Sequence, residues 1–158
     1  MGYYIEPTPL ASQHIDAGQF ADVQLAGSVL EYKEAKRQFF HNIGIGGSFL
    51  GAALVLGGRV YIGCADRNFY ALSPQGAELW RLTANGVVPY QAVAADGLLY
   101  FGSFDGRLYA VRQDGSVAWT FQANDKILTS PALAPGRVVF GSKDGNVYCV
   151  DATSGREL

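Results

Sequence analysis

The chain repeats itself with a period of 39 residues, and this period constrains the fold more than any other feature of the sequence. Glycine, tyrosine and tryptophan recur in one register in successive copies: Gly63, Gly102 and Gly141; Tyr70, Tyr109 and Tyr148; Trp80 and Trp119. A fixed period of this length is typical of repeat architectures, in which each copy is one supersecondary unit stacked on the next. The sequence therefore predicts a stack of similar units.

We divide the chain into about four units of 39 residues within a single domain, residues 1–158. The units are 12–51, which is degenerate, 52–90, 91–129, and 130–158, which is incomplete. In the degenerate unit, Phe40 stands where later units have tryptophan. Residues 22–40 have a second interpretation, an amphipathic helix with its apolar side chains on one side. We favour strands for this segment.

Within a unit, short apolar runs are separated by turn residues. Asp105–Gly106 and Asp144–Gly145 each stand between two such runs. Asp-Gly in this position is a strong hairpin signal because glycine adopts a positive φ without steric cost. The preceding copy has Asp66–Arg67 instead, so we expect Asn68 to take the left-handed conformation there. A second hairpin is predicted at Asp114–Gly115.

Each unit is interpreted as four strands: one of small apolar residues, two of bulky apolar residues, and a more polar one that carries the tryptophan. The two middle strands are apolar nearly throughout, as in residues 98–101, which indicates that both of their faces are covered. A single four-stranded sheet cannot cover its own faces, whereas radial stacking of copies can. We therefore predict an all-β fold of β-propeller blades, each of four antiparallel strands, in a partial propeller or half-ring. Its end blades would have bare faces, which we expect self-association to cover.

The repeated segments resemble those of the PQQ-like repeat family, which is found in quinoprotein-type propellers. In that family an alanine begins a segment that ends in glycine, three further residues and a tryptophan that docks on the neighbouring blade. Two copies here have this arrangement: Ala71, Gly76 and Trp80, and then Ala110, Gly115 and Trp119. The third copy runs from Cys149 to Leu158, and its tryptophan would be the next residue. WD-type and kelch repeats fit less well.

The resemblance raises the question of a redox cofactor. Quinoprotein dehydrogenases are similar to one another in having adjacent cysteines, a tryptophan stacked on the cofactor and a calcium site of carboxylates and amides. Here Cys64 and Cys149 are far apart in the sequence, and both tryptophans occupy the repeated docking position. The hairpin aspartates, such as Asp105, are explained by hydrogen bonds to nearby backbone amides. We therefore expect no PQQ, no calcium or other metal, and no catalytic residue in this segment.

Charge and hydropathy argue against two kinds of partner. The net charge is −2 and no dense basic surface is supplied, so we expect no nucleic-acid binding. The most apolar window, residues 42–58, is too short and too broken by glycine for a membrane span. The first residues lack a secretory signal pattern, and only the family resemblance suggests an extracytoplasmic or periplasmic location.

The favoured function is that of a non-catalytic scaffold or recognition segment, within a larger protein, that binds a protein or a small ligand. The segments that join one unit to the next vary most between units, and varied loops on a repeated framework are where binding residues concentrate. Four residues in these loops are our candidates: Tyr90, Gln91, Asp125 and Lys126. The alternatives are a portion of a PQQ-dependent dehydrogenase and a sensor domain of a signalling protein.

Overall fold

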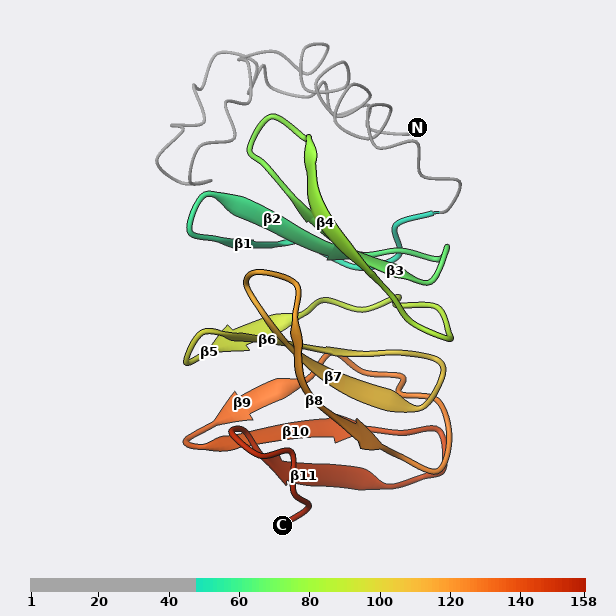
Figure 1. Cartoon of the computed structure of the whole chain (residues 1–158). Coiled ribbons are helices and arrows are strands. Elements are labelled where there is room, and N and C mark those ends of the chain that lie inside the picture. The colour runs from blue at the N-terminus through green and yellow to red at the C-terminus, as the bar shows by residue number, and fades with distance from the viewer. Residues whose placement is uncertain (1–47) are drawn as a thin grey trace, which may run out of the picture.

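The computed structural model describes residues 48–158, and every regular element in that range is a β-strand (Figure 1). The predicted all-β class is therefore confirmed for this range. The degenerate unit, 12–51, lies outside the described residues except at its end, and the alternative helix over 22–40 lies wholly outside them. No helix in the described range is long and apolar enough to cross a membrane.

The strands form three antiparallel sheets in which neighbours in the chain are neighbours in the sheet. The first sheet contains β1 (Leu54–Leu56), β2 (Arg59–Gly63), β3 (Asn68–Leu72) and β4 (Glu78–Thr83). The second contains β5 (Val93–Ala95), β6 (Leu98–Gly102), β7 (Arg107–Arg112) and β8 (Val117–Gln122). The third contains β9 (Ala132–Ala134), β10 (Arg137–Gly141) and β11 (Val147–Asp151). Beyond β11, an isolated bridge pairs Val150 with Glu157.

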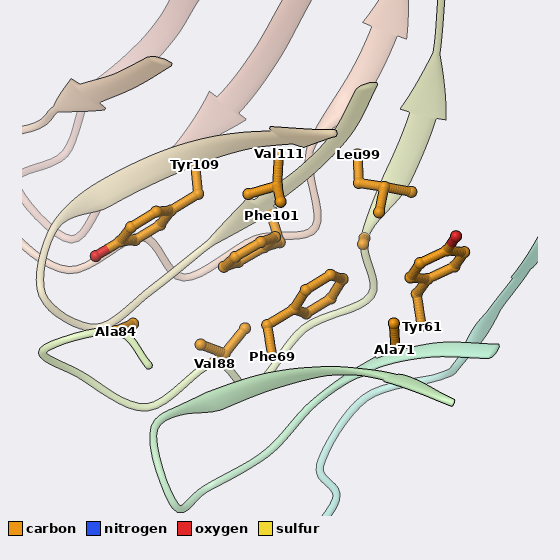
Figure 2. Close-up of a cluster of buried hydrophobic side chains, with 10 residues drawn as sticks. Tyr61, Phe69, Ala71, Ala84, Val88, Leu99, Phe101, Tyr109 and Val111 are labelled. Atoms are coloured by element: carbon orange, nitrogen blue, oxygen red, sulfur yellow. The ribbon is translucent and has the colours of Figure 1, made fainter. Parts of the chain in front are cut away.

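The sheets lie one over another, and apolar side chains fill the space between them (Figure 1). Between the first and second sheets, Phe69 stacks on Phe101 with ring centroids 4.0 Å apart, and Phe101 stacks on Tyr109 at 5.1 Å (Figure 2). Between the second and third, Phe140 stacks on Tyr148 at 5.5 Å. The middle strands of the first two sheets thus bury both faces, as their continuous apolar runs predict. The stacked sheets are the predicted propeller blades.

Each tryptophan ties its own sheet to the next one. The Trp80 Nε1 donates a hydrogen bond to the Gln113 carbonyl at 2.9 Å, and the Trp119 Nε1 donates one to the Ala152 carbonyl at 3.2 Å. The Trp119 ring lies so close to Gly155 that a Cβ there would come within 2.5 Å of it. Two kinds of residue, tryptophan in one sheet and glycine in the next, therefore build each junction.

At the first hairpin the prediction for Asn68 is wrong. Arg67 adopts the left-handed conformation, with φ 76°, and stands in line with Gly106 at φ 81° and Gly145 at φ 89°. Asn68 is already the first residue of β3 and pairs with Thr83, so it must be extended. The hairpin therefore has the same backbone geometry in all three sheets. In the first sheet an arginine adopts the left-handed conformation that glycine adopts in the other two.

The far face of the third sheet remains open. Side chains alternate along a strand, so the residues of β11 that do not face the second sheet point the other way. Val147 on this face is 76% exposed, and Cys149 is partly exposed. Self-association across such a bare face stays a prediction.

Candidate functional site

The hairpins that join the two middle strands of each sheet are held by an aspartate and a tyrosine four residues apart. The tyrosine hydroxyl donates to the carboxylate in all three copies: Tyr70 to Asp66 at 2.6 Å, Tyr109 to Asp105 at 2.7 Å, and Tyr148 to Asp144 at 2.7 Å. The other carboxylate oxygen accepts a backbone N–H two residues on, as at Asp105, which the Arg107 N–H reaches at 2.9 Å. These carboxylates are structural elements of the hairpins.

The bonds shift the pKa values of the two partners in opposite directions. The Tyr148 hydroxyl, by donating to Asp144, lowers the pKa of that carboxyl group. Burial, followed by the hydrogen bond to Asp105, raises the pKa of Tyr109 to about 12. Asp105 also binds the β4–β5 connection, because its Oδ2 accepts the Asn85 N–H at 3.0 Å. The hairpin of the second sheet is therefore fixed to the connection that enters that sheet.

The same hairpin brings two of the four predicted residues together. Phe104 stands at its tip and is partly buried. The Tyr90 ring meets the Phe104 ring edge-on, with centroids 6.3 Å apart, and the Lys126 Nζ lies 5.5 Å from the Phe104 centroid. Tyr90 belongs to the β4–β5 connection and Lys126 to the β8–β9 connection, so three loops meet on one aromatic ring.

The other two predicted residues lie at the edge of this group. Gln91 is exposed and its side chain forms no hydrogen bond with any described residue. The Asp125 Oδ1 accepts the backbone N–H of Lys126 at 2.7 Å, so its carboxylate shapes the loop. The Asp125 carbonyl accepts the Ser142 hydroxyl at 3.1 Å and joins the loop to the third sheet.

Sequence reasoning missed Phe104. The residue before the hairpin aspartate is Ala65, Phe104 and Lys143 in successive copies, which are the most dissimilar side chains in that turn. The available signal for Phe104 was that the aligned position is small in one copy and charged in another but aromatic here. It identifies a position free to vary without loss of the hairpin.

Lys126, which lies over this ring, has a second lysine beside it. The Lys143 backbone N–H donates to the Lys126 carbonyl at 2.8 Å, which sets the two residues side by side. The ion pair of the described range is Arg81–Glu78, so neither ammonium group is paired with a carboxylate there. Both lysines are exposed. We call Tyr90, Phe104, Lys126 and Lys143 the aromatic–lysine patch.

In the part of the chain that the structure describes, the residues that could hold a metal or a redox group are dispersed. Within residues 48–158, no three side chains of His, Cys, Asp or Glu gather as metal ligands would. Cys64 and Cys149 are free thiols, and burial raises the pKa of Cys64 to about 11, so that its thiol stays protonated at neutral pH. The thiol points at the Ser48 carbonyl, 3.6 Å away.

A shallow depression of about 380 Å³ lies at the outer edge of the third sheet. Its lining includes Phe121 and Gln122 of β8, Val147 of β11, and Glu157. It runs along the part of β11 that has no fourth strand beside it among the described residues. The depression lies beside β11 in the third sheet, where the first and second sheets have their fourth strands, β4 and β8.

Antiparallel four-stranded sheets, stacked in chain order and joined by a tryptophan that reaches the next sheet, define a β-propeller repeat protein. The chain belongs to the PQQ-like repeat family, since the family model described as outer membrane protein assembly factor BamB matches residues 65–158. Comparison with curated proteins gives no match.

Solved structures with the same fold include BamB from Moraxella catarrhalis, with 18% identity, a TM-score of 0.62, and coverage of 71% of this chain and 37% of that one. Quinohemoprotein alcohol dehydrogenase ADHIIG from Pseudomonas putida HK5 has 24% identity and a TM-score of 0.65, with 70% of this chain and 20% of that one covered. The computationally designed Ika4 protein has 19% identity and a TM-score of 0.65, with 73% and 72% covered. The chain thus spans well under half of the two natural proteins, and these likenesses establish the fold.

Proposed function

We propose that this chain is a non-catalytic recognition segment of a β-propeller that binds another protein in the assembly of outer-membrane proteins. The description of its family supplies the process. The observation that carries the binding role is the meeting of three loops on Phe104, which places an aromatic ring and a lysine at the surface of a rigid framework. Aromatic side chains held in this way are typical anchors of protein interfaces.

The proposal places the chain outside the cytoplasm, in the periplasm, where outer-membrane proteins are assembled. It also assigns no PQQ and no calcium to this segment. The three hairpin carboxylates support this because each already accepts a tyrosine hydroxyl and a backbone amide. Both indole N–H groups are likewise used between sheets. Residues committed to the fold are poorly available to a cofactor.

Site-specific photo-crosslinking in the cells that express the chain tests the binding role. A photoreactive amino acid at Gln91, which is exposed beside the patch, is expected to form an adduct with an outer-membrane assembly protein. The same group at Ser116, exposed in the β7–β8 turn at the other end of the strands, is the matched control and is expected to form none. Equal adducts from both positions, or none from Gln91, would contradict the proposal.

The dehydrogenase alternative has a separate test. Addition of PQQ and calcium to the purified chain is expected to change neither its visible absorbance nor its thermal midpoint, because a ligand that binds the folded state raises that midpoint. A saturable increase in either signal would overturn the non-catalytic assignment.

A further inference from the structure

The aromatic–lysine patch is built on an inflexible part of the molecule. The Phe104 backbone N–H donates to the Val87 carbonyl at 2.8 Å, which fixes the hairpin tip to the β4–β5 connection. The Ser103 hydroxyl accepts the Asp105 N–H at 3.2 Å, and the Gly106 N–H reaches the Ser103 carbonyl at 3.1 Å. A hairpin held in this way loses little backbone entropy when a ligand packs on its ring.

The ring serves no purpose in the hairpin itself. The first sheet has Ala65 at this position and the third has Lys143, and both keep the same turn, because Arg67 and Gly145 share the left-handed geometry of Gly106. Phe104 also lies outside the three clusters of the core. A partly exposed phenylalanine that neither the turn nor the core requires is available for contact with another molecule.

The patch offers two chemistries side by side. Tyr90 and Phe104 present aromatic surface, and among the described residues no group bonds to the Tyr90 hydroxyl, which is left for a partner. Lys126 and Lys143 present ammonium groups on long stems. The neighbouring carboxylates have hydrogen bonds of their own: Asp105 with the Tyr109 hydroxyl and the Arg107 N–H, Asp125 with the Lys126 N–H, and Asp144 with the Tyr148 hydroxyl and the Asn146 N–H. Among the described residues, the two ammonium groups are therefore the charged groups of the patch that have no hydrogen-bond or ion-pair partner.

From this juxtaposition we infer that the patch binds an extended peptide segment in which an aromatic residue is flanked by carboxylates. The aromatic side chain packs on Phe104 and Tyr90, while the carboxylates pair with Lys126 and Lys143. Charge complementarity of this kind mainly sets specificity and association rate, and the aromatic contact supplies most of the affinity. This inference rests on the proposed function and names the chemistry of the partner.

Binding of three fluorescent peptides to the 158-residue chain tests the inference. The probe has the sequence Gly-Glu-Phe-Glu-Phe-Glu-Gly; one comparison peptide has lysine in place of glutamate, and the other has alanine in place of phenylalanine. The probe is expected to bind at least roughly tenfold more tightly than either, a difference of about 1.4 kcal/mol. Equal binding of all three peptides, or no binding of the probe at millimolar concentration, would overturn it.

Variants locate the site. Lys126→Glu and Phe104→Ala are each expected to weaken probe binding at least fivefold. Arg137→Glu makes a similar charge change beside the β9–β10 turn, at the other end of the strands, and is expected to leave binding unchanged. Phe104→Ala should fold normally because Ala65 occupies the same place in the first sheet, and far-ultraviolet circular dichroism verifies this. Binding unaffected by both patch variants would contradict the inference.

Vesicles of phosphatidylglycerol distinguish a lipid surface from a peptide. Vesicle binding that Lys126→Glu abolishes while Phe104→Ala leaves it intact would assign the patch to anionic lipid and overturn the peptide inference. Crosslinks from Gln91 without peptide binding would refute this inference alone. Peptide binding without crosslinks in cells would refute the proposed function and leave the chemistry of the patch in place.

Discussion

A methyl group added at Gly155 should break the junction between the second and third sheets. Gly155 has φ +71°, and a Cβ there would lie 2.5 Å from Trp119 Cε3 and 2.7 Å from Trp119 Cδ2. Real Cβ atoms do not approach this closely, so the indole must move. Gly136 is the matched control, since it has φ +66° in the same sheet and its Cβ would meet nothing within 4 Å.

The difference between the two substitutions can be estimated from these geometries. Both variants pay the cost of a left-handed alanine, about 1–2 kcal/mol. Gly155→Ala adds overpacking, typically about 1–3 kcal/mol. It also weakens the hydrogen bond from Trp119 Nε1 to the Ala152 carbonyl, now 3.2 Å long, which is worth about 1 kcal/mol. We therefore expect Gly155→Ala to be less stable than Gly136→Ala by about 2–4 kcal/mol.

Urea denaturation with fluorescence detection measures this difference, because the chain has two tryptophans and Trp119 is one of them. At about 2–4 °C per kcal/mol, the thermal midpoint should lie roughly 4–16 °C below that of Gly136→Ala. Combining Gly155→Ala with Trp119→Leu should recover about 1–3 kcal/mol in a double-mutant cycle, since the two groups are in contact. Equal stability of the two alanine variants, with an unchanged emission spectrum, would refute the account of the junction.

Three further outcomes are expected. Tyr61→Phe should leave the free energy of unfolding unchanged or raise it, because the buried Tyr61 hydroxyl has no hydrogen-bond partner in the described range. Tyr100→Phe should lower the free energy of unfolding by about 1 kcal/mol, because it removes a 3.0 Å hydrogen bond to a backbone carbonyl. Chemical denaturation compares the two variants, and equal losses of stability would contradict the assignment. Arg67→Gly should stabilise the chain by about 1 kcal/mol by removing a left-handed arginine, measured as a higher urea midpoint, and a lower midpoint would show that the arginine has a compensating role. The pKa of Tyr109 is raised from 10.0 to about 12 in the folded state, so its stabilising contribution is complete below pH 10 and is lost as the pH rises to 12. When the free energy of unfolding is measured at several alkaline pH values, it should fall less steeply with pH for Tyr109→Phe than for the unchanged chain. Parallel curves would contradict the shift in pKa.

Much of the fold could be predicted from residue patterns within one unit. The apolar runs placed the middle strands, and Asp105–Gly106 and Asp114–Gly115 placed the turns, because both signals are local. Arg67 was missed because a propensity argument favours asparagine in the left-handed region. The ladder overrides it, since Asn68 must pair with Thr83 and the turn ends one residue earlier.

The candidate site was harder to predict because it is formed between units. Tyr90 and Lys126 were identified as loop residues, but they are 36 positions apart and meet only because Phe104, from a third loop, stands between them. No spacing within a single unit encodes this contact. Asp125, by contrast, was a candidate whose carboxylate turns inward to its own loop.

The tryptophan junction has a consequence for how such chains change over evolutionary time. Each tryptophan finds its acceptor 33 positions ahead, in the following copy, so a copy carries one half of two different joints. A duplicated copy contains both a tryptophan and an acceptor, so it can be inserted between two existing copies without further change. When a copy loses its glycine, the tryptophan of the preceding copy loses its docking position. Selection therefore acts on neighbouring pairs of copies. As a result, the number of copies can change more easily than the surface where two copies meet.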